Sequence, residues 1–328
     1  MTDIMNFLVA AVLAACPLLL GTLGEGLTEK SGNLNLGVEG MMFMGGIAGL
    51  AGAYYYEKSV AEPVAWISVL IAVICAFLCA AFGALLYSVL TITLRANQNV
   101  TGLALTIFGT GFGNFFGEYF SNLEGGYIAV SATTKAAFNN PLIPALSGIP
   151  IVGKLLFSFN FMVYLSIILA IAMWYFFSST RKGLNLKAVG ERHAAADAAG
   201  INVTAYKYLA TCIGGGITGL GGLYIVMNSS NGVGGVWVQN CIGGYGWLSV
   251  ALVIFATWHP SRAILCSLVF GALSVMRYYF PIANVPISVY AMFPYIATVI
   301  VLITASLRKK RENQPPASLG LAYFREER

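Results

Sequence analysis

Residues 24–42 of the chain read GEGLTEKSGNLNLGVEGMM, a run in which acids, amides and glycines interrupt sequence that is otherwise strongly apolar. Polar groups are costly in hydrocarbon, so such a segment in a membrane protein usually lines a cavity or a pathway. Long apolar runs continue on both sides of it. The segment therefore predicts membrane helices that are interrupted where polar groups line a cavity or a pathway.

The composition of the 328-residue chain supports a membrane protein. It is 58% hydrophobic and 9% charged, whereas soluble domains carry roughly 25% charged residues. We predict an all-α, polytopic fold with about nine (8–10) transmembrane helices, some of them broken by glycine. The predicted spans are 5–23, 36–56, 64–90, 100–120, 161–180, 208–227, 242–257, 263–280 and 287–306. Residues 1–307 form one membrane domain, and residues 308–328 form a tail.

The net charge of +5 would suggest a nucleic-acid partner in a soluble protein, but in a membrane protein the side on which the basic residues fall matters more. With the N-terminus outside, fourteen of the eighteen Lys and Arg residues fall inside and only Lys58, Lys135, Lys154 and Arg277 fall outside. We therefore expect a cytoplasmic C-terminus and no nucleic-acid partner. The tail, with Pro315 and Pro316, is expected to be poorly ordered.

A second polar segment, residues 181–207, lies inside by the same count. We call it the coupling segment, because a partner at the inner face could dock on it. Residues 188–203 read AVGERHAAADAAGINV. The alanine-rich stretch from Glu191 to Ala199 favours a short surface helix, and Gly200 is well placed to end it. The alternative is a solvated connector without a partner.

With these two segments the chain resembles the permease subunits of ABC importers of the branched-chain, ribose and nucleoside group, and most closely the nucleoside branch. The resemblance covers nearly the whole chain. It implies three kinds of partner: an ABC ATPase subunit, a second and different permease subunit, and an extracytoplasmic solute-binding lipoprotein, all at the bacterial cytoplasmic membrane. In the coupling segment it assigns ATPase contact to Glu191, Arg192, Ala195, Asp197, Gly200 and Asn202.

No G-x-x-x-x-G-K-[ST] sequence occurs in the chain, so it has no phosphate-binding loop of that type. No nucleophile and base pair suggests an enzyme either. We expect no cofactor on this chain, with ATP and Mg²⁺ bound by the partner subunit. Two histidines and six cysteines without paired spacing indicate neither a metal site nor a disulfide framework.

The candidate substrate pathway begins in the opening segment. Glu39 precedes a continuous apolar run, so its carboxyl group should face protein or water. It could line the pathway or tie two helices together. Asn33 and Asn35 offer donors and acceptors to a hydroxylated or heterocyclic solute, or could cap the second span. Glu25, Glu29 and Lys30, at the inner end of the first span, could pair with one another or with the ATPase, or could form a solvated interfacial cluster.

Further pathway candidates come from two later segments. Asn114 lies four residues before Glu118 on one face of the fourth span. Gln239 and Asn240 open a second glycine-rich segment that resembles the first. Two glycine stripes predict helix seams, with sliding faces as the alternative; they are Gly109, Gly113 and Gly117, and Gly215, Gly219 and Gly222. Tyr278 and Tyr279 fit a membrane boundary.

These observations predict the membrane subunit of an ATP-driven importer of nucleosides or related purine or sugar solutes, working by alternating access. The alternative is an ion-coupled secondary transporter or channel that needs no ATPase. A membrane scaffold that transports nothing is a third possibility. Uptake by the purified chain alone would favour the second, because only a permease of the first kind depends on a partner's ATP hydrolysis.

Overall fold

The computed structural model describes residues 2–143, 152–228, 234–281, 286–307 and 314–324. Within these residues the chain is helical, and an isolated bridge between Ala129 and Val236 is the only strand-like pairing. The helices are α1 (Thr2–Lys30), α2 (Val38–Ser59), α3 (Ala65–Ser88), the π-helix η1 (Val89–Thr93), α4 (Gln98–Leu123), α5 (Ala132–Asn139), α7 (Val152–Leu156), α8 (Phe161–Ser179), α9 (Arg181–Glu191), α10 (His193–Ala198), α11 (Val203–Met227), α12 (Tyr245–Phe255), α13 (Pro260–Tyr279) and α14 (Ile287–Leu307).

Six helices of the described residues are long and apolar enough to cross a membrane, namely α1, α3 with η1, α4, α8, α11 and α13. The predicted all-α polytopic fold is therefore confirmed. Each of the nine predicted spans contains a helix, but α12 has only 11 residues. At 1.5 Å per residue it covers about 16 Å of a hydrocarbon layer of about 30 Å. The prediction that 242–257 crosses the membrane alone is wrong.

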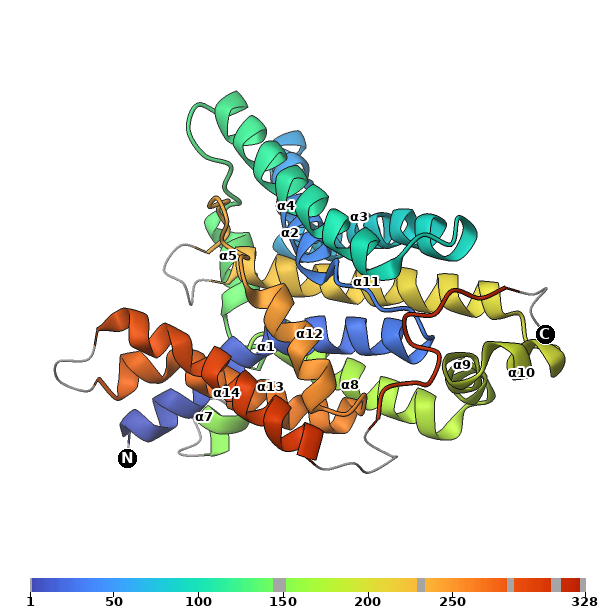
Figure 1. Cartoon of the computed structure of the whole chain (residues 1–328). Coiled ribbons are helices and arrows are strands. Elements are labelled where there is room, and N and C mark those ends of the chain that lie inside the picture. The colour runs from blue at the N-terminus through green and yellow to red at the C-terminus, as the bar shows by residue number, and fades with distance from the viewer. Residues whose placement is uncertain (1, 144–151, 229–233, 282–285, 308–313, 325–328) are drawn as a thin grey trace.

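The long helices α1 and α11 run side by side through the middle of the bundle (Figure 1), and α11 also packs against α2 and α3. Most of α2 is buried between these helices and α4. At one end of the bundle, α9 and α10 lie beside the described C-terminal residues (Figure 1). We call this the basic end, because Lys30, Arg95 and the residues of α9 lie there; the N-terminus lies at the other end (Figure 1).

The glycine stripe of α4 is a helix seam, as predicted. A Cβ atom on Gly109 would come within 2.4 Å of the Gly40 Cα atom, so the backbones of α4 and α2 touch here. Gly113 makes room for the side chain of Phe43 on α2, and Gly117 makes room for the indole of Trp237 in the loop before α12. In lipid, where hydrophobicity does not drive helices together, such close approach supplies the packing energy.

Replacing Gly109 by Ala is expected to destabilise the protein by about 1–3 kcal/mol, since the new methyl group overpacks a backbone contact. Gly111, two residues on, has no atom within 4 Å of its Cβ position. There the same substitution should be neutral or stabilise the helix by up to about 1 kcal/mol. Thermal unfolding of the two purified variants in detergent checks this, and equal midpoints would contradict the seam.

The tail departs from its prediction, because residues 314–324 pack on the basic end instead of being poorly ordered. The Ser318 N–H donates to the Gly190 carbonyl at 3.0 Å, and the Gly320 N–H donates to the Gly32 carbonyl at 3.1 Å. We call residues 314–324 the C-terminal strap. The strap joins α9 to the turn between α1 and α2. Composition alone suggested disorder because these bonds are made to residues far away in sequence.

Candidate functional site

The turn between α1 and α2, residues 31–37, is built from the polar opening segment and is buried. Asn33 and Asn35 are at most 1% exposed. The Asn33 amide donates to the Thr211 hydroxyl at 2.9 Å, while the Asn35 side-chain oxygen accepts the Gly37 N–H at 2.9 Å. The N-cap of α2 is Gly37 itself, so neither asparagine caps α2 in the predicted position. The Asn33 oxygen has no hydrogen-bond partner among the described residues.

Two acids of α1 hold this turn and its surroundings. The Glu25 carboxylate accepts the Asn35 N–H at 3.1 Å, and the Glu29 carboxylate accepts the indole N–H of Trp258. Both acids are 1% exposed, so the solvated cluster considered from sequence is wrong. Buried carboxyl groups need such donors. The acids therefore connect α1 to the α1–α2 turn and to the residues after α12.

Glu39 joins the two glycine-broken segments that the sequence indicated. Its carboxylate accepts the Gly244 N–H at 3.0 Å and a backbone N–H of Trp247. Gly244, with φ of 91°, is the N-cap of α12, so the carboxylate lies at the positive end of that short helix. A Cβ atom on Gly246 would lie 2.3 Å from the Glu39 Cα atom. Glu39 thus ties α2 to α12, and its part in a pathway stays a prediction.

The other predicted pathway residues meet where the loop before α12 crosses α4. The Asn240 N–H donates to the Asn114 side-chain oxygen at 3.1 Å, and the Gln239 amide donates to Glu118 at 3.0 Å. Gln239, Asn240 and Glu118 are exposed. We call Glu39, Asn114, Glu118, Gln239 and Asn240 the polar strip. The Asn33 amide and the Asn35 side-chain oxygen bond to Thr211 and Gly37, outside the strip.

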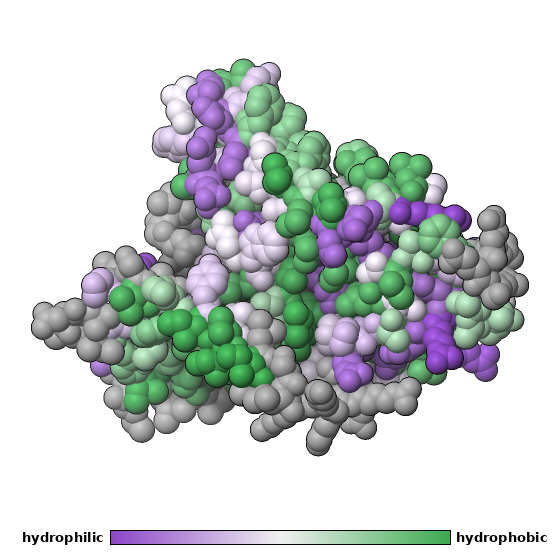
Figure 2. Space-filling view, in the orientation of Figure 1, coloured by the Kyte–Doolittle hydropathy of each residue, from purple (hydrophilic) through white to green (hydrophobic). Residues whose placement is uncertain are grey.

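The polar strip lies on a face that also carries apolar side chains. Figure 2 shows hydrophilic residues gathered where the loop before α12 meets the outer half of α4, and hydrophobic residues over α14. On α14, Met292, Val299 and Ile303 are each more than half exposed. A strip of amides and carboxylates within such a face can make hydrogen bonds to a polar solute that the surrounding surface cannot.

The predicted coupling segment forms two helices. Glu191 ends α9, Arg192 is extended with φ of −148°, and α10 runs from His193 to Ala198. The single helix expected from Glu191 to Ala199 is therefore wrong at its start, whereas Gly200, with φ of 81°, ends it as predicted. The Asn202 side chain then accepts the Ala205 N–H and caps α11.

The helix α10 has a buried and an exposed side. His193 and Ala196 are 7% and 3% exposed and face the bundle, while Ala194, Ala195 and Ala198 are exposed. Burial, and then the charge of Lys207, lower the pKa of His193 to about 3, so its imidazole is neutral at physiological pH. The neutral ring packs edge-on against Tyr323 of the strap, with centroids 5.7 Å apart. The exposed side therefore carries three small alanine side chains.

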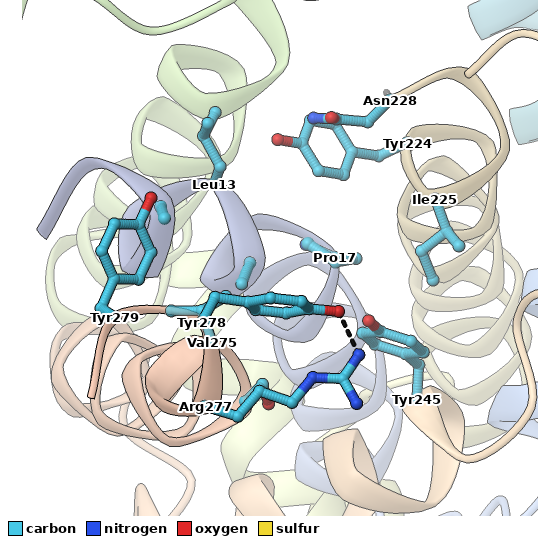
Figure 3. Close-up of a pocket in the computed structure, with 13 residues that line it drawn as sticks. Leu13, Pro17, Tyr224, Ile225, Asn228, Tyr245, Val275, Arg277, Tyr278 and Tyr279 are labelled. Carbon is cyan, nitrogen blue, oxygen red and sulfur yellow. Dashed lines mark hydrogen bonds between the residues drawn. The ribbon is translucent and has the colours of Figure 1, made fainter. Parts of the chain in front are cut away.

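A cavity of about 660 Å³ that sequence analysis did not predict opens beside the start of α12. Figure 3 shows the Arg277 guanidinium group beside the hydroxyl ends of Tyr278 and Tyr245. Arg277 donates to the Tyr278 hydroxyl and stacks on its ring at 4.3 Å from the centroid. Such walls can stack on a planar ring and donate hydrogen bonds. The available signal was Arg277 followed by Tyr278 and Tyr279, but the sequence predicted only a membrane boundary for the two tyrosines and an outside position for Arg277.

Known proteins resemble the chain over most of its length. Residues 7–302 match the family described as branched-chain amino acid transport system / permease component. A putative glucose ABC transporter permease protein of Haloferax volcanii is 32% identical over 97% of each chain. The nucleoside ABC transporter permease protein NupC of Lactococcus lactis is 32% identical over 89% of each chain, and the guanosine ABC transporter permease protein NupQ of Bacillus subtilis 31% over 92% of each. No solved structure matches the chain.

Proposed function

The chain belongs to the permease component family of branched-chain amino acid transport systems, and from that premise we propose that it is the membrane subunit of an ATP-driven importer of nucleosides or related purine or sugar solutes. The importer works by alternating access. Support for the solute class comes from the relatives named for nucleosides, guanosine and glucose. All three solutes carry hydroxyl groups, which the amides of the polar strip can bind.

We propose three partners for this subunit. An ABC ATPase binds ATP and Mg²⁺ and docks on α10, so this chain needs no cofactor of its own. A second, different permease subunit covers the face that carries the polar strip, and a solute-binding lipoprotein delivers the solute at the opposite end. The charge distribution supports a cytoplasmic basic end in a bacterial cytoplasmic membrane, with the C-terminus on that side.

The hydrogen bonds between Glu39 and the N-terminus of α12 give this proposal its main support. These bonds join α2, which is packed in the bundle, to a short helix whose preceding loop forms the exposed part of the polar strip. Movement of the bundle would therefore move the strip. We expect the polar strip to bind the solute weakly, because a solute that binds tightly in the pathway leaves it slowly.

Replacing Glu39 by Ala is expected to lower ATP-driven uptake of guanosine about tenfold or more, because two backbone donors at the start of α12 lose a charged acceptor. Glu39→Gln keeps one acceptor oxygen and should retain an intermediate rate. Uptake is measured in proteoliposomes that contain the permease pair, the ATPase and the binding protein.

Glu62, an exposed acid in the loop between α2 and α3, provides the matched control as Glu62→Gln. This variant should import at the wild-type rate. Undiminished uptake by Glu39→Ala would mean that the polar strip is not part of the solute pathway. Uptake that continues without ATP would instead indicate the ion-coupled alternative.

A further inference from the structure

A second cavity, of about 320 Å³, lies at the basic end and takes its walls from three separate parts of the chain. Thr91, Ile92 and Thr93 come from η1, followed by Arg95. Val203, Thr204 and Lys207 come from the first turns of α11, and Tyr323 comes from the C-terminal strap. None of these lining residues is acidic. The cavity is distinct from the polar strip and from the exposed side of α10.

Lys207 is the buried cation of this cavity. It is 2% exposed, and within the described part of the chain its ammonium group has no hydrogen bond or ion pair. Burying a charged group costs free energy unless it is paired, and most buried charged groups in proteins are paired. The ammonium group lines the cavity and is available to an anion that enters it.

Arg95 provides a second cation at the mouth of the cavity. Its side chain is exposed, and its guanidinium group stacks on the Phe324 ring with 4.5 Å to the centroid. Stacking fixes the plane of the group, and the described residues accept no hydrogen bond from it, so its N–H donors remain available. The first turn of α11, which carries Thr204, adds the positive end of a helix.

From this geometry we infer that the cavity binds a phosphate-bearing anion. A fixed guanidinium group can make two parallel hydrogen bonds to phosphate oxygens, and an ammonium group acts as a point charge on a third. The volume suits a phosphate group with a small organic part. Because the site lies at the end of the membrane bundle, this group belongs either to a soluble phosphorylated metabolite or to a lipid headgroup.

The test uses the full-length chain in nanodiscs of zwitterionic phosphatidylcholine and titrates it with inorganic phosphate and with AMP, followed by calorimetry. At least one of them should bind, with Kd raised about tenfold or more in Arg95→Gln and in Lys207→Gln. Lys182→Gln removes the same charge from an exposed position of α9 and should leave Kd unchanged. Arg95 is exposed, so that variant remains informative if Lys207→Gln does not fold.

A lipid source is tested with nanodiscs that contain phosphatidylglycerol. Stabilisation by this lipid that Arg95→Gln abolishes, without binding of either soluble probe, would place a headgroup in the site. Equal weakening of binding by Lys182→Gln would overturn the proposal, since it would mean nonspecific attraction. Two acids, Glu326 and Glu327, follow the strap in the sequence. Binding seen only after both are changed to Gln would overturn it in favour of the chain's own carboxylates.

Discussion

Replacing Ala195 by Arg is expected to weaken the binding of the proposed ATPase subunit strongly. Ala195 lies on the exposed side of α10, while His193 and Ala196 hold the other side against the bundle. A long charged side chain at this position blocks insertion of the helix into a groove without disturbing its seat. A loss of about 2 kcal/mol at the centre of an interface corresponds to about thirtyfold in Kd. Co-purification of the ATPase with the tagged permease measures it.

The matched control is Ala61→Arg, an exposed alanine in the loop between α2 and α3. The ATPase should co-purify with this variant as it does with the wild type. Proline at position 195 is a weaker test, because Ala195 lies in the first turn of α10, where proline is tolerated. Capture of the ATPase by Ala195→Arg at wild-type affinity would mean that α10 is a solvated connector.

The helices of this protein could be predicted from local sequence because their causes are local. An apolar run long enough to cross a membrane must satisfy its own backbone, and this alone makes it helical. The end of α10 was predictable for a similar reason, since Gly200 adopts a φ of 81° that other residues rarely take. The break at Arg192 was not, because the flanking residues favour helix and the last carbonyl groups of α9, on Gly190 and Glu191, are bound by Ser318 of the distant strap.

The residues of the polar strip could be predicted from the sequence, but their hydrogen-bond partners could not. Glu39 and Asn240 stand out because polar groups are costly in apolar sequence. Their actual partners, Gly244 and Asn114, lie 205 and 126 residues away. Only the packing of α12 between distant helices decides these pairs. The same holds for Lys207, whose place beside the strap is invisible in the sequence of α11.

Ending the chain after Asn313, which removes the C-terminal strap, is expected to abolish uptake while the ATPase continues to hydrolyse ATP. The strap binds α9 through Ser318 and the α1–α2 turn through Gly320. The Gln98 amide of α4 also donates to the Leu321 carbonyl at 3.4 Å. These bonds fasten α9 to the α1–α2 turn and to the start of α4, and the turn leads into the first turn of α2, which carries Glu39. Without them, movement of α10 is no longer transmitted to the polar strip.

Two further variants decide whether the strap acts through these contacts. Ending the chain after Phe324 leaves the strap in place and should preserve uptake. In the full-length chain, Gly320→Ala forces a side chain onto a residue with φ of 80°, at a cost of about 1–2 kcal/mol, and weakens the bond to Gly32. It should give an intermediate loss of uptake per ATP hydrolysed, measured in proteoliposomes. Wild-type coupling in the chain that ends at Asn313 would mean that α10 drives the membrane helices through α9 and α11 alone.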